Sequence, residues 1–225
     1  MNNSYNPIPD IYFFENQGNP TLRSPNSPYE ISFYQTRDTL NNPELYEDFI
    51  KNCISRFRSS KTYKNYKCFL YDIGLDHSQI HGNISSEMAS LEMHHNILTV
   101  FDIAFVITEW FINTTGRVST FDVVTMLKNV HKRHMVSLIM LDETTHQVYH
   151  DDPMFWIDPK QCTPGWFQFL SEFHEGITKS IAFKIINYFD EAIKNGNMTT
   201  EDNGILDVRE HVINWSQLNE NQYYR

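Results

Sequence analysis

Two short stretches contain the residues with the clearest capacity for chemistry. His94 and His95 stand together in the apolar run 91–96, and His146 and His150 lie four apart in a segment with helical character. Residues four apart share one face of a helix, so these two imidazoles can reach the same atom. Neighbouring residues on a strand point to opposite faces, so only one of His94 and His95 faces the helix unless the strand is bent. The spacing predicts a metal site of three imidazoles, with a fourth histidine just outside it.

The order of these residues resembles the HNH, or ββα-metal, nuclease motif. That motif has a His-His pair on its first strand, then a second strand, then a helix carrying His-x-x-x-His. Here the pair is His94-His95, residues 137–141 supply the second strand, and the helix carries His146 and His150. The surrounding region also resembles a group of bacteriophage-encoded HNH-like proteins.

The resemblance implies an endonuclease that hydrolyses phosphodiester bonds of DNA with one divalent metal ion, Zn, Mg or Mn. His94, His146 and His150 would be the metal ligands. His95 would be the general base that takes a proton from the attacking water. Ser137 stands where the motif has an asparagine, and it would orient His95 through a weaker hydroxyl hydrogen bond. The segment between His95 and Ser137 is longer than the usual loop of the motif, so it must hold a folded insertion.

The residues around this site are open to more than one interpretation. Glu92 precedes His94 by two residues and shares its face of a regular strand. It is either an acceptor for a ligand imidazole or a surface carboxylate. His131 and His134 are interpreted as surface or partly buried side chains, because the two basic residues between them disfavour a cation.

Charge and composition bear on the partners. The chain has 225 residues, 40% of them hydrophobic, which is enough for one good-sized core. No apolar run is long enough to span a membrane, so we expect no membrane partner and, for a phage-encoded protein, a place in the host cytoplasm. The net charge of −10 counts against nucleic-acid binding, but residues 51–67 include no acidic residue. Five basic residues of this stretch are candidates for binding DNA, with a solvated helix face as the alternative: Arg56, Arg58, Lys61, Lys64 and Lys67.

The predicted fold class is α+β, a small ββα-metal motif with a helical-hairpin insertion, surrounded by helices and preceded by an extended arm. Residues 1–42 contain more than half of the nine prolines and would form this arm, which could contact protein partners. Residues 43–195 would form the HNH-like domain, with the insertion at about 98–134. Residues 155–158 are predicted to be a further strand, and residues 196–225 a polar C-terminal tail.

Three functions remain open on this evidence. A nuclease would bind metal and cleave DNA. A catalytically inactive HNH-like subunit of a phage assembly, structural or DNA-binding and stabilised by metal, would bind the ion without cleaving. A metal-free assembly protein would do neither, so metal analysis of the purified protein separates it from the other two.

Overall fold

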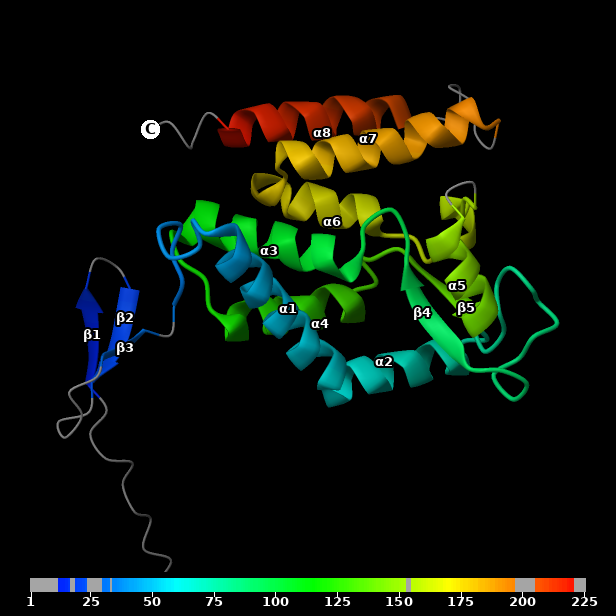
Figure 1. Cartoon of the computed structure of the whole chain (residues 1–225), viewed down its shortest axis with the longest axis horizontal. Helices are drawn as coiled ribbons and strands as arrows, with labels where there is room; N and C mark the ends of the chain where they lie inside the picture. The colour runs from blue at the N-terminus through cyan, green and yellow to red at the C-terminus, as the bar shows by residue number, and fades with distance from the viewer. Residues whose placement is uncertain are drawn as a thin grey trace, which may run out of the picture.

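The computed structural model of the chain is mostly helical. It describes residues 12–16, 19–23, 30–32, 34–152, 155–196 and 205–220. Within these residues there are eight α-helices and two small antiparallel sheets (Figure 1). No described helix is both long and apolar enough to cross a membrane. The coarse prediction of an α+β protein is therefore confirmed, although helices dominate.

The predicted arm contains a small sheet. Three strands pair antiparallel in the order β1-β2-β3: β1 (Tyr12–Asn16), β2 (Asn19–Arg23) and β3 (Glu30–Ser32). The chain then joins the helical body, where Gln35 forms a bridge with Val118. Arg37 donates hydrogen bonds of 2.8 Å to both carboxylate oxygens of the buried Glu109. This ion pair fixes the point at which the chain enters the body.

The helix boundaries follow local capping rules. The helices are α1 (Pro43–Ser59), α2 (Lys61–Asp72), α3 (Val100–Thr115), α4 (Thr120–Lys132), α5 (Glu143–Asp151), α6 (Trp166–Glu172), α7 (Lys179–Lys194) and α8 (Ile205–Glu220), with 3₁₀ turns η1 (Pro159–Gln161) and η2 (His174–Gly176). The side chain of Asn42 caps α1, and Pro43 fills its first position. Thr99 and Ser119 open α3 and α4 with reciprocal capping boxes.

Helix α3 lies at the centre of the main core. It packs against α1, α4 and η2; its aliphatic side chains are buried and its four aromatic side chains are partly buried. Gly176 in η2 approaches α3 so closely that a Cβ there would lie 2.1 Å from the carbonyl oxygen of Val106. The segment predicted as an insertion is thus part of the main core, because its apolar residues pack against the other helices.

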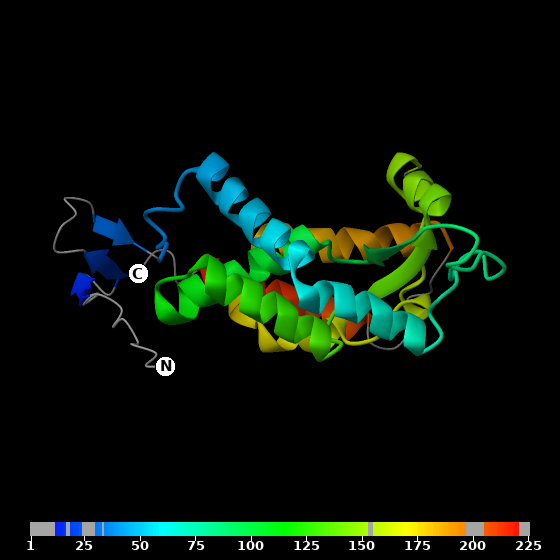
Figure 2. The same cartoon turned by 90° about the horizontal axis from the view of Figure 1, so that it is seen from below.

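The second sheet consists of β4 (Leu91–His95) and β5 (Leu138–Asp142), which pair antiparallel. His94 pairs with Ile139 and His95 with Leu138, so the two histidines lie on opposite faces of the sheet. One face joins the main core. The other lies against a smaller cluster and α5, at the end of the body opposite the β1–β3 sheet (Figures 1 and 2).

Two predicted segments differ from the structure. Residues 155–158 are not a strand, because Gln79 and Thr163 already bond to the free edge of β5 through Met140 and Leu138. The predicted polar tail includes α8, which packs on α7 and buries apolar side chains four residues apart: Val208 and Val212.

Candidate metal centre

A buried carboxylate sets the start of α5. Asp142 is the last residue of β5 and the N-cap of α5, and it accepts hydrogen bonds from the backbone N–H of Thr145 at 3.0 Å and its hydroxyl at 2.7 Å. The hydroxyl of Ser78 donates a third, also at 2.7 Å. Burial raises the pKa of Asp142, but these bonds outweigh it and bring the pKa down to about 2. An ionised cap therefore holds the first turn of α5 on the end of β5.

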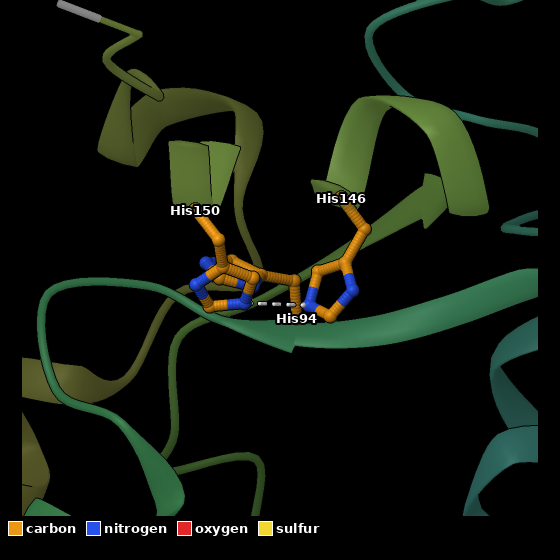
Figure 3. A group of neighbouring side chains, drawn as sticks. All are labelled: His94, His146 and His150. Atoms are coloured by element: carbon orange, nitrogen blue, oxygen red, sulfur yellow. Dashed lines mark hydrogen bonds between the residues drawn. The ribbon is translucent and has the colours of Figure 1, made fainter. Parts of the chain in front are cut away.

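Three imidazoles from two elements converge beside this turn. Figure 3 shows His94 from β4 with His146 and His150 from α5. One ring nitrogen of each lies within 4.8 Å of those of the other two. Nε2 of His146 and Nε2 of His150 are 3.3 Å apart, and two ligands in a tetrahedral site with bonds of about 2.05 Å are separated by about 3.3 Å. The two nitrogens of His146 and His150 thus have the separation that two ligands of a small tetrahedral cation require.

The ring of His94 provides the most informative observation. It is buried, and its Nε2 has no hydrogen-bond partner among the residues that the structure describes. The ring of Tyr149 packs on it with centroids 4.2 Å apart, which holds it toward α5. A buried ring nitrogen without a partner is unfavourable by about 1–3 kcal/mol. A cation bound between the three rings could give this nitrogen a partner and remove that cost.

The charge states suit metal binding. Burial lowers the pKa of His94 to about 4, and the neighbouring His146 and His150 act in the same direction. Burial also lowers the pKa of His146, although Glu92 opposes it. Oε2 of Glu92 lies 2.6 Å from Nδ1 of His146, so Nδ1 carries the proton and Nε2 presents its lone pair to the other rings. Of the two interpretations left open for Glu92, an acceptor for an imidazole or a surface carboxylate, the contact with His146 favours the acceptor.

His95 belongs to a different cluster. It points to the opposite face of β4, with its Nε2 3.0 Å from Nε2 of His131. Nδ1 of His131 donates to the carbonyl oxygen of Leu127 at 2.7 Å, so its Nε2 accepts and His95 donates. Both rings are buried, and burial lowers the pKa of His131 to about 4 and that of His95 well below its ordinary value. His131 was expected to be a surface or partly buried side chain, whereas it is fully buried.

Ser137 and Asn96 lie beyond the two strands. The hydroxyl of Ser137 is buried without a hydrogen-bond partner among the described residues, whereas the partner of His95 is His131. Nδ2 of Asn96 lies 2.9 Å from the hydroxyl of Tyr188 and 3.2 Å from the carbonyl oxygen of Ile157. Sequence reasoning missed Asn96, although a polar residue directly after an apolar strand is a signal for a buried hydrogen-bonding role.

A pocket of about 530 Å³ opens beside the three histidines. Two of the five basic residues predicted to bind DNA, Arg58 and Lys67, reach it from α1 and α2. Lys67 donates to the carbonyl oxygen of Leu91 at 2.6 Å. The other three lie on exposed helix surface away from this pocket: Arg56, Lys61 and Lys64.

Comparison with known proteins corrects the functional prediction. No curated protein and no solved structure matches the chain. Residues 10–219 match the family described as "Bacteriophage G278-like virion protein". The HNH family assignment and the predicted DNA-binding endonuclease are therefore wrong, and the role of His95 as a base falls with them. A short pattern of histidines specifies a possible metal geometry, which unrelated proteins share, and not a reaction. Because the match covers nearly the whole sequence, the chain belongs to the family of Bacteriophage G278-like virion proteins.

Proposed function

We propose that the protein is a structural component of a phage virion in which a divalent metal ion, bound by His94, His146 and His150, fastens α5 to β4. The observation that supports the ion is the ring of His94: its buried Nε2 has no partner among the described residues, and one of its ring nitrogens lies within 4.8 Å of nitrogens of His146 and His150. In this proposal the ββα arrangement of β4, β5 and α5 stabilises the fold, and no step of catalysis depends on it.

The packing of α5 supports a structural use of metal. Thr145 is the single buried residue among the nine residues of this helix, all of which the structure describes. Isolated helices of this length are unstable in water, so their stability comes from tertiary contacts. The apolar contacts of α5 are few. A bond from each of His146 and His150 to an ion that β4 also binds would add the stabilisation that these contacts do not provide.

The donor set favours one of the metals expected from the sequence. Neutral imidazoles suit Zn²⁺, which commonly takes three histidines and one further ligand. Mg²⁺ prefers oxygen donors and keeps much of its water. Glu92 would hold His146 in the tautomer that binds metal. We therefore expect zinc, with His94, His146 and His150 as its protein ligands.

The proposal also concerns neighbours in the particle. A structural virion protein works in contact with other proteins, and the β1–β3 sheet lies at the end of the body away from the metal centre (Figure 1). The N-terminal arm would contact such a neighbour. The Arg37–Glu109 ion pair would then connect the arm, and with it the bound neighbour, to α3.

Metal analysis with thermal unfolding tests the proposal. Purified protein is expected to contain about one zinc per chain, and EDTA should lower the melting temperature. Saturation at about 100 times the dissociation constant corresponds to about 2.7 kcal/mol, hence roughly 5–10 °C for a chain of this size. His150→Ala should abolish the EDTA effect, while His81→Ala, a change at another exposed histidine, should retain it. Protein without metal, whose melting temperature is unaffected by both zinc and EDTA, would refute the proposal.

A further inference from the structure

The pocket beside the three histidines has an excess of positive groups. Arg58 and Lys67 line it from α1 and α2, together with His146 and His150 from α5. Among the described residues that line it, Glu92 is the one carboxylate, and it is paired with Nδ1 of His146. With a divalent ion on the imidazoles, the pocket would carry a net positive charge in a partly enclosed space. Such a space favours an anionic ligand.

Arg58 has donors available for this ligand. It is exposed and makes no hydrogen bond or ion pair with any residue in the described part of the chain. Arg56, on the same helix, differs because its Nε donates to Oδ1 of Asn52 at 2.8 Å. A guanidinium presents five N–H groups in a planar fork that matches the two oxygens of a carboxylate. Arg58 is thus placed to contact an anion that enters the pocket.

The metal centre also lacks a ligand of its own. The described part of the chain brings three candidate ligands together here, and zinc takes four. His150 is exposed and His146 half-buried, so the remaining position is accessible from solvent. The fourth ligand must therefore come from outside the described residues.

We propose that this position binds a carboxylate, supplied in the particle by an acidic side chain of a neighbouring virion protein and contacted also by Arg58. The inference rests on the proposed metal-stabilised virion role and deepens it by naming the ligand and its source. One carboxylate oxygen bonds the ion, and the guanidinium donates to the other. The metal centre then joins two proteins as well as two elements of one chain.

Cobalt substitution of the full-length protein provides the test, because the visible absorption of Co²⁺ responds to its fourth ligand. Acetate at constant ionic strength is the probe, and it should produce a saturable spectral change. Arg58→Ala should raise the dissociation constant of acetate roughly fivefold, the effect of losing one exposed charged contact, without weakening the binding of Co²⁺. Arg56→Ala, the matched control, should leave both constants unchanged.

The outcomes separate the two proposals. Cobalt binding with no response to acetate, or equal acetate affinity in Arg58→Ala and the parent, overturns the carboxylate site and leaves the metal centre standing. Failure to bind cobalt or zinc overturns both. Inorganic phosphate is titrated in parallel, and binding of phosphate tighter than that of acetate would overturn the choice of a carboxylate.

Discussion

Acidification is expected to destabilise the protein through the buried pair of His95 and His131. The pKa of His131 in the folded protein is about 4, against an ordinary value of 6.5. Between these two values the unfolded chain binds a proton that the folded chain excludes. The stability that the neutral ring contributes is therefore fully present above about pH 6.5. It is lost progressively as the pH falls toward 4.

The size of this effect follows from the shift. One pKa unit corresponds to 1.36 kcal/mol, so His131 alone accounts for about 2.5 kcal/mol of unfolding free energy between about pH 7.5 and about pH 4.5. No discount for solvent applies because the ring is fully buried. His95 adds to the loss in the same direction, since its pKa also lies well below the ordinary value.

Urea unfolding at a series of pH values measures the loss. EDTA is present throughout, so that release of metal does not contribute. His131→Gln keeps an oxygen that can accept from His95 but has no titrating ring, so its stability should depend less steeply on pH by about 2 kcal/mol over the same range. His81→Gln removes an exposed ring and should leave the slope unchanged. Equal losses in the parent and in His131→Gln would refute the reasoning.

Three further changes test separate parts of the structure. Glu92→Gln should weaken zinc affinity by roughly 10–100-fold in chelator competition, because the carboxylate orients His146; unchanged affinity would remove Glu92 from the centre. Gly176→Ala should lower the unfolding free energy by roughly 3 kcal/mol or more, because its Cβ would overlap the carbonyl oxygen of Val106; a normal urea midpoint would contradict this packing. Asp142→Asn should lower stability by about 1–2 kcal/mol through loss of the ionised cap, with faster amide exchange in α5; exchange as slow as in the parent would show that the cap is dispensable.

Local signals are sufficient to locate several helix starts. The cap at Asn42 and the capping boxes at Thr99 and Ser119 depend on residues within four positions, so a sequence pattern can identify them, although the box at Thr99 was not predicted. The strand containing His94 and His95 and the helix containing His146 and His150 were also predicted in the right order. The meeting of His94 with the two helix histidines follows from periods of two and about four residues.

Long-range packing set the limit of these predictions. α8 is polar in sequence and is held by contacts with α7, which no local pattern contains. His131 was interpreted as a surface or partly buried side chain beside the basic Lys132 and Arg133, yet consecutive residues on a helix point in different directions. His131 turns inward to His95, while Lys132 and Arg133 are exposed.

The short motif also misled the functional prediction. Within it, His95 lies on the opposite face of β4 from His94 and donates to the buried His131. The residues that position it belong to α4, inside the segment predicted as an insertion. A motif of four histidines includes no information on these neighbours, and the family match over residues 10–219 supplied what the motif could not.

Two histidines in succession, His94 and His95, make the register of β4 relative to β5 ambiguous. A slip of one position would move every side chain of the strand to the other face, but it would still present a histidine to α5. The proposed metal coordination by itself would therefore select poorly between the correct register and its neighbour. The slip would shift the carbonyl of Leu91 away from Lys67, and Asn96 away from Tyr188, by about 3.3 Å. It would also take Leu91 out of the main core and turn Glu92 toward it, so discrimination against misaligned molecules falls to residues outside the proposed ligand set.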